Sequence, residues 1–163
     1  MTTLLKDLAR EDATRVLDEH WDGQYPVDPA RIANRMGIKV WRTDMPDDTS
    51  GAIVKREGAP AEIYFDADEP PQRQRFTCAH EIGHYIDRQR HQDAQYSFQD
   101  LRRGAANTPE EFYADHFAGN LLMPRRKVLA MWNEGNTTND MADFFAVSLS
   151  AMGTRLRSLG LAA

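Results

Sequence analysis

The residues whose types and spacing suggest chemistry lie mid-chain, in the stretch His80-Glu81-Ile82-Gly83-His84. On a helix, residues four apart lie one turn above each other, so His80 and His84 can direct imidazole nitrogens at one metal ion about 2 Å away. Glu81 flanks the same face and is placed to exchange a proton with an attacking water. The pattern predicts a zinc-dependent peptidase site, although a surface helix can also carry two histidines by chance.

A zinc site with two histidines needs a third protein ligand and one open position. Glu111 and Asp115 lie four residues apart on a second predicted helix, which Thr108 caps and Pro109 begins. We predict that Glu111 is the third ligand and that Asp115 accepts a hydrogen bond from the outer nitrogen of a liganding histidine. Glu110 is the alternative ligand, and these acids could instead serve only the helix start, where acids are favoured.

Five further side chains have the chemistry for a role near such a site. We consider Tyr113, His116 and Tyr85 as candidates to stabilise a tetrahedral oxyanion. His91 resembles a further metal ligand, but we expect a solvated loop histidine. Cys78 is the one cysteine, and its apolar surroundings predict core filling rather than a nucleophile.

The rest of the chain has to position these residues. Periodic apolar residues predict helices, and short alternating runs predict strands. Polar residues 91–107 are expected to form a loop over the site. The fold class is therefore α+β, with zincin-like helices packed on a small, antiparallel, three-stranded sheet, one strand of which would hold substrate in extended form. We expect helices at 3–22, 29–36, 71–88 and 108–124, and strands at 38–42, 52–55 and 62–65.

The last third of the chain is predicted to be a small helical tail. We divide the chain into a metallopeptidase core, 1–124, and a tail, 125–163, which has a helix-turn-helix layout and packs on the core. Ser148 is a credible cap for the last helix. A DNA-binding tail would present Arg155 and Arg157 to a groove. The alternative, which we favour, is that apolar residues pack the helix pair on the core: Met141, Phe144, Met152, Leu156 and Leu159.

Composition narrows the remaining possibilities. The 163 residues suit one domain with a small appendage. The net charge of −5 argues against binding nucleic acid through the whole surface. A lone cysteine fits a reducing cytoplasm. The start of the chain lacks the apolar region of a signal peptide, and no run of 18 apolar residues occurs, so we expect a cytoplasmic protein without a membrane span.

Two separated motifs together resemble the ImmA/IrrE family of metallopeptidases. The first motif is Arg75-Phe76-Thr77-x-Ala79-His80-Glu81-x-Gly83-His84, and the second is Glu111-x-x-Ala114-Asp115-x-Phe117-Ala118-x-x-Leu121-Leu122-Met123-Pro124.

The resemblance implies a cytoplasmic zinc peptidase of a kind often found on phages and mobile elements or in stress responses. Such proteins relieve repression by cleaving a helix-turn-helix repressor of the Xre type. By resemblance, His80, His84 and Glu111 would bind the metal, and Glu81 would be the catalytic acid and base. The metal would be Zn²⁺, although Mn²⁺ or Fe²⁺ also suits two histidines and a carboxylate. The alternative is a non-catalytic toxin or antirepressor that only binds its helix-turn-helix partner, an antitoxin or repressor.

Overall fold

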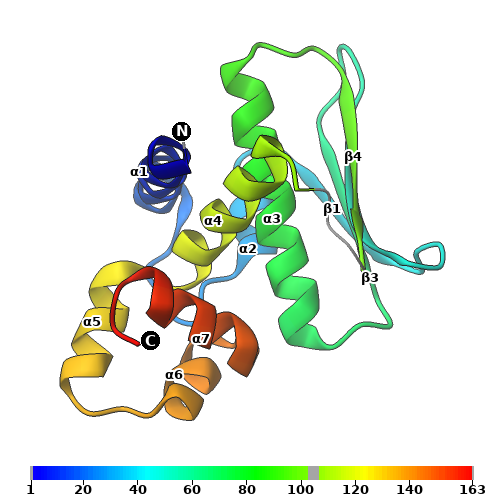
Figure 1. The fold of residues 1–163 in the computed structure, drawn as a ribbon. Helices are drawn as coiled ribbons and strands as arrows, with labels where there is room; N and C mark the ends of the chain where they lie inside the picture. Colours follow the sequence, from blue (N-terminus) through cyan, green and yellow to red (C-terminus); the bar gives the residue numbers. More distant parts are fainter. Residues whose placement is uncertain (1, 103–106, 163) are drawn as a thin grey trace.

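The structure is a computed structural model that describes residues 2–102 and 107–162 (Figure 1). Within these residues, seven helices and four strands form an α+β fold, as the sequence predicted. The helices are α1 (Thr2–His20), α2 (Pro29–Arg35), α3 (Pro71–Arg90), α4 (Pro109–Leu122), α5 (Arg125–Asn133), α6 (Thr138–Phe145) and α7 (Leu149–Ser158). The strands are β1 (Lys39–Thr43), β2 (Thr49–Lys55), β3 (Glu62–Asp66) and β4 (Tyr96–Leu101).

The sheet is four-stranded and mixed, with the strand order β1-β3-β2-β4. Strand β2 runs antiparallel to both β3 and β4, as expected for neighbouring strands. Strand β1 instead lies on the far side of β3 and runs parallel to it, with Lys39 opposite Glu62 and Thr43 opposite Asp66. The prediction of an antiparallel three-stranded sheet was therefore wrong in both strand number and direction. The parallel pair arises because β1 does not pair with the next strand in the chain.

Strand β4 lies within residues 91–107, which we had predicted to be a loop. Tyr96, Phe98 and Asp100 are half-buried, and they alternate with the exposed residues between them. This alternation is the mark of a strand with one covered face. The composition hid it, because the covered face includes an aspartate and most of the other residues in 91–107 are polar.

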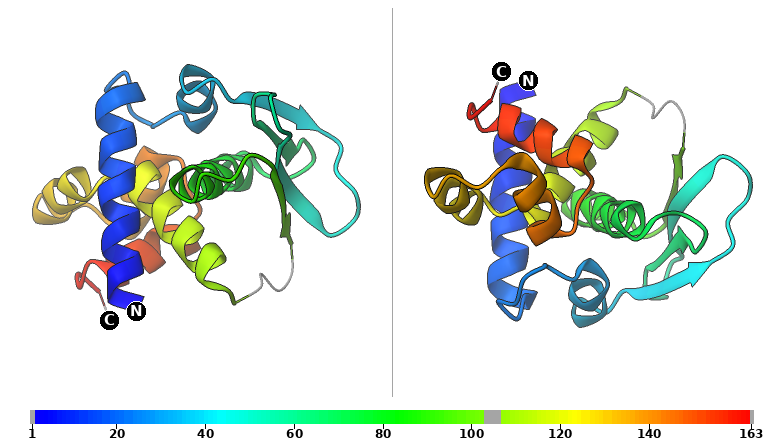
Figure 2. Two further views of the ribbon diagram at one scale, coloured as in Figure 1. Left: turned by 90° about the horizontal axis from the view of Figure 1, so that it is seen from above. Right: turned by 90° about the horizontal axis from the view of Figure 1, so that it is seen from below.

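Helix α3 is the centre of the molecule. Figure 2 shows it end-on between the sheet and α4, with α1 on the far side of α4. A Cβ atom added to Gly83 of α3 would lie 3.0 Å from the Cα atom of Ala114 in α4. On the sheet side, a Cβ atom at Gly51 would overlap the side chain of Thr77. The two glycines, which lack a side chain, thus let α3 approach α4 and the sheet closely.

Helix starts were predicted well, because each depends on a local hydrogen bond. The side chains of Asp28, Thr108 and Ser148 accept hydrogen bonds from backbone nitrogens three residues later, at 3.2, 3.2 and 3.0 Å. Thr108 and Ser148 are the caps expected from the sequence, and Asp28 caps α2 in the same way. They set where α2, α4 and α7 begin.

A buried carboxylate on α1 joins the two central helices. Asp12 accepts a hydrogen bond of 2.6 Å from the hydroxyl of Tyr113 in α4, and it also pairs with Arg90 at the end of α3. Asp12 is 2% exposed, so this contact is shielded from water. Helix α1 therefore fastens α3 and α4 to each other at one end.

Helices α5, α6 and α7 gather at the end of the molecule where α4 finishes (Figure 1). Met141, Met152 and Leu156 are buried and belong to the same apolar cluster as the core of α3 and α4. Arg155 is also buried, and its Nε donates to the backbone carbonyl of Met123 at 3.0 Å. No helix in the described ranges is long and apolar enough to cross a bilayer.

Candidate metal centre

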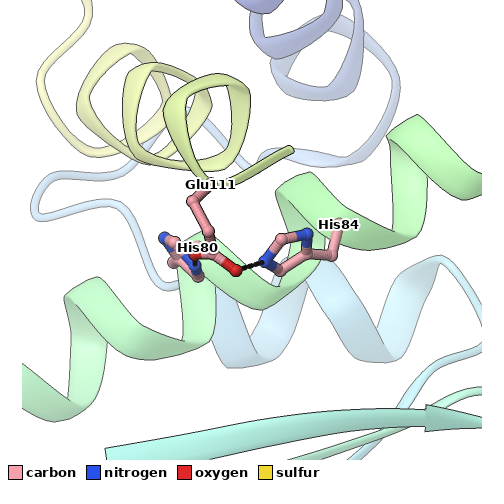
Figure 3. Close-up of side chains that lie close together, drawn as sticks. All are labelled: His80, His84 and Glu111. Carbon is pink, nitrogen blue, oxygen red and sulfur yellow. Dashed lines mark ion pairs between the residues drawn. The ribbon is translucent and has the colours of Figure 1, made fainter. Parts of the chain in front are cut away.

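The structure brings His80, His84 and Glu111 together between α3 and α4. The two histidines lie one turn apart on α3, and the carboxylate of Glu111 reaches from α4 to lie between their rings (Figure 3). Glu111 Oε2 is 2.9 Å from His80 Nε2, and Glu111 Oε1 is 3.1 Å from His84 Nε2. The ligand atoms of all three residues lie within 4.8 Å of one another.

These donors fit a metal ion. Tetrahedral ligands 2.0–2.1 Å from zinc lie about 3.3 Å from each other. The observed separations of 2.9 and 3.1 Å are close to this value. His80 Nε2 is buried, and its close polar neighbour in the described structure is Glu111 Oε2, so a metal would compete with a proton for this nitrogen. Two imidazoles and a carboxylate are also a common catalytic zinc set, with one position left open.

Two neighbours orient the histidine rings. Asp115 Oδ1 lies 2.8 Å from His80 Nδ1, the nitrogen on the far side of the ring from Glu111. The ring of His84 stacks on Phe98 of β4, with centroids 4.2 Å apart and an interplanar angle of 5°. The predicted contact between Asp115 and a histidine is therefore present in the structure. Strand β4 supplies a second support that the sequence analysis did not foresee.

The local electrostatics favour a bound cation. Burial raises the pKa of Glu111, but the two imidazoles outweigh this and bring the pKa to about 2. The carboxylate is thus ionised at neutral pH, in the form that binds metals. Burial lowers the pKa of His80, yet the carboxylates of Asp115 and Glu111 raise it well above its usual value. A place that attracts a proton so strongly also attracts a metal cation, which competes for the same nitrogen.

Glu81 is the most unusual side chain of the centre. It is 0% exposed, and within the described residues neither carboxylate oxygen has a hydrogen-bond partner. Burial raises its pKa well above the usual value, while the charge of His80 opposes the rise. An unpartnered buried carboxylate is costly, so its presence marks a site kept for something other than stability.

Asp100 of β4 is a site residue that the sequence analysis missed. Its carboxylate lies near His80 and Glu81, and one ligand atom from each of the three falls within 4.8 Å of the others. Burial raises the pKa of Asp100, and His80 opposes the rise. The signal that could have found it is the alternation of Tyr96, Phe98 and Asp100, which places the three on one face of a strand.

Other candidates lie away from the cluster. The hydroxyl of Tyr113 is bonded to Asp12 on the opposite side of α4, so Tyr113 is excluded as an oxyanion donor. Tyr85 lines a separate hollow beside α1 and α2. His91 is exposed and its Nδ1 lies 2.8 Å from the carbonyl of Asp87, as expected for a solvated histidine at the end of a helix. Glu110 is outside the cluster, whose carboxylate comes from Glu111.

Two further predictions concern Cys78 and His116. Cys78 is 1% exposed and packs in the core, where burial raises the pKa of its thiol, so it is not a nucleophile. His116 lines the same cleft as Asp115 and Asp100, and it is thus the oxyanion candidate that this cleft contains. Arg155, which a DNA-binding tail would expose, is buried. The groove-facing role considered for Arg155 is therefore wrong.

A cleft of about 480 Å³ adjoins the cluster. Its walls come from α3, β4, α4 and α7, and its lining includes Asp100 and Asp115 beside the metal ligands. Apolar side chains such as Phe76, Phe112 and Met123 form much of the remaining wall. The cleft reaches the centre through Asp100 and Asp115, the two acids beside His80, whereas His80, His84, Glu111 and Glu81 are not among its lining residues.

Comparison with known proteins places this geometry in context. The model of the IrrE N-terminal-like domain family, peptidase M78, matches residues 33–157. A solved structure of a Mycobacterium tuberculosis transcriptional regulator is similar, with a TM-score of 0.64 and 18% sequence identity. The match covers 91% of this chain but 46% of that one, so the chain spans about half the length of that regulator. A search of curated protein sequences gave no match.

Proposed function

Because the chain belongs to the IrrE N-terminal-like peptidase family, we propose that it is a metal-dependent endopeptidase acting inside the cell on one specific protein. The substrate class we propose is an Xre-type helix-turn-helix repressor or antitoxin, whose cleavage would relieve repression. The observation that carries the peptidase assignment is Glu81, a wholly buried carboxylate without a partner in the described structure, next to the three donors. A purely structural metal site has no need of such a group.

His80, His84 and Glu111 would hold the metal, and Zn²⁺ suits them best, with Mn²⁺ or Fe²⁺ as alternatives. A bound zinc ion supplies Lewis acidity, which polarises the scissile carbonyl and activates a water. Asp115 fixes the ring of His80 by holding its Nδ1 hydrogen, which leaves Nε2 free to bind.

Glu81 moves the protons. It follows His80 on the inner face of α3. A bound cation would favour its ionised form, whose oxygens, unpartnered in the described structure, can accept a proton from the attacking water. The same carboxyl group can then deliver that proton to the leaving amine, which completes the cleavage of the peptide bond. Burial keeps bulk water from competing for this proton.

Strand β4 is the candidate for holding the substrate. It is an edge strand, paired with β2 on one side, and Phe98 and Asp100 place it beside the histidines. The unpaired side of an edge strand can bind an extended peptide through backbone hydrogen bonds. We expected this role of one of the three predicted strands; the proposal moves it to β4, which lies in the segment predicted to be a loop.

The test is cleavage by a matched pair of variants. The metal-loaded protein is incubated with the Xre-type regulator encoded nearest to its gene, and products are followed by mass spectrometry. We expect Glu81→Gln to abolish cleavage while metal content stays that of the wild type, and Glu110→Gln to cleave normally. Undiminished cleavage by Glu81→Gln would sink the mechanism.

The same experiment separates the rival function. If the wild-type protein relieves repression while the regulator stays full length, the chain acts by binding its partner rather than by cutting it. The helix-turn-helix-like pair α6 and α7 is the feature that would suit such docking.

A further inference from the structure

Arg155 is a buried cation whose charge lacks a counter-charge in the described structure. The residue is 7% exposed, and its Nε is occupied by the carbonyl of Met123. Its Nη2 has no hydrogen-bond partner within residues 2–102 and 107–162. Burial, with a smaller contribution from the cation Arg125, lowers the pKa of Arg155 to about 10. Among the residues that the structure describes, no carboxylate compensates this buried guanidinium charge, which is costly.

Arg155 lies where two hollows meet. The first is the cleft of about 480 Å³ beside the metal ligands, whose near end contains Asp115. The second, of about 280 Å³, lies against α1 and the start of α5. The two hollows share His116, Arg155 and Ser158 as lining residues, so they are neighbours. A peptide that lies in the first hollow beside Asp115 can therefore also contact Arg155.

The other cations of the first hollow are already neutralised. Arg73 pairs with Glu69 at 3.4 Å. Arg102 pairs with Asp66 and, at 3.1 Å, with Glu69. Arg155 is left as the cation of this cleft that no described carboxylate pairs with.

The second hollow reinforces the positive charge. Lys6, Arg10 and Arg125 line it together with Arg155. Its one carboxylate in the described lining, Asp7, lies 3.2 Å from Arg10 and is paired with it. The whole chain has a net charge of −5, so this positive region runs against the average of the surface. A positive region in a substrate cleft favours substrates that carry a negative charge at that place.

We infer that Arg155 anchors a specificity subsite for an acidic side chain, Asp or Glu, of the peptide substrate. The inference rests on the proposed peptidase function. The carboxylate would pair with the positive charge of Arg155 where this residue lines the cleft, rather than with its buried Nη2. The apolar walls formed by Phe112 and Met123 would contact the carbon atoms of the same or a neighbouring residue. The protein would then prefer sites that carry an acid at one fixed distance from the bond that is cut.

The first experiment profiles cleavage of a peptide library. We expect the metal-loaded wild type to favour Asp or Glu at one position near the cut. Arg155→Met should lose that preference, with kcat/KM for acidic peptides falling at least about tenfold, as when one partner of a buried charge pair is removed. Arg157→Met is the matched control, because Arg157 is exposed on the same helix, and it should keep the preference. Cleavage by the wild type without any acidic preference would overturn the inference.

The second experiment needs no catalysis. The wild-type protein, labelled with ¹⁵N in its arginine side chains, is titrated with N-acetyl-glutamate amide and, separately, with N-acetyl-glutamine amide. We expect the Nε–H signal of Arg155 to shift with the acid and not with its neutral counterpart. Equal shifts, or none, would contradict the subsite even if Arg155→Met failed to fold. If the wild type cuts no peptide but this selective shift is seen, the peptidase function fails and the acid-binding site stands.

Discussion

His80 is held at both of its ring nitrogens by carboxylates of one helix. Asp115 Oδ1 lies 2.8 Å from Nδ1, and Glu111 Oε2 lies 2.9 Å from Nε2. The two acids are four residues apart on α4, so one helical face contacts both edges of an imidazole on α3. The bond to Asp115 favours hydrogen on Nδ1, so Nε2 is the nitrogen at which a metal would replace the proton shared with Glu111.

Replacing Asp115 by alanine should weaken metal binding by about 10–100-fold, the usual cost of losing the group that orients a liganding histidine. Zinc affinity is measured by competition with a chromophoric chelator. The side chain of Asp115 is 54% exposed, so the free energy of unfolding of the metal-free protein should change little. Asp143→Ala, an exposed aspartate on α6, is the control and should bind zinc as the wild type does. Equal affinity of both variants would remove Asp115 from the site.

Zinc should stabilise the folded protein. A ligand that binds only the folded state at 100 times its Kd raises the free energy of unfolding by about 2.7 kcal/mol. We therefore expect Tm to rise when zinc is added and to fall back to the value of the metal-free protein when a chelator removes the zinc. Glu111→Gln should greatly reduce this rise, whereas Glu110→Gln should preserve it. If Glu110→Gln reduced the rise in Tm and Glu111→Gln preserved it, Glu110 would be the third ligand.

Much of the centre could be predicted because its spacing is local. His80 and His84, like Glu111 and Asp115, are four residues apart, and helix geometry alone places each pair on one face. The same geometry explains why Tyr113 was wrongly considered as an oxyanion donor. It lies two residues after Glu111, about 200° around the helix, and so it points to the opposite side of α4.

What could not be predicted depends on pairing between distant segments. Strand β4 exists because residues 96–101 pair with β2, more than 40 positions earlier in the chain, and its polar sequence alone favours a loop. Asp100 enters the site only through that pairing. The position of β1 beside β3 likewise depends on pairing between segments that are not consecutive in the chain, because β1 and β2 do not pair.

Gly83→Ala should damage the site, because the added Cβ would lie 3.0 Å from the backbone of Ala114 and 3.2 Å from Phe117. Overpacking costs about 1–3 kcal/mol, partly offset by about 1 kcal/mol of helix propensity. We expect a net loss of stability and weaker zinc binding, since α3 and α4 must move apart. Gly119→Ala on α4 meets nothing within 4 Å and should stabilise instead. Urea unfolding of both variants tests this opposite sign.

Asp12→Ala should destabilise the protein by about 1–3 kcal/mol, the range for leaving a buried hydrogen-bonding group unpaired, because Arg90 is 33% exposed and keeps Asp87 as a partner. The loss leaves Arg90 without this partner and the hydroxyl of Tyr113 without its acceptor. Asp7→Ala removes an ion pair on the same helix whose side chains are about half exposed, and it should cost less than about 1 kcal/mol. Similar losses for the two variants in urea unfolding would show that the Asp12 contact contributes no more than a surface pair.

Helix α1 precedes the residues that match the family, yet its Asp12 joins the two helices that carry the metal ligands. A fragment that begins at residue 33 keeps His80, His84 and Glu111 but lacks the carboxylate between Arg90 and Tyr113. A protease that cuts the connection between α1 and α2 would likewise detach this brace while leaving all three ligands in one piece. The N-terminal segment is therefore a point from which the metal centre can be loosened without any change to the residues that form it.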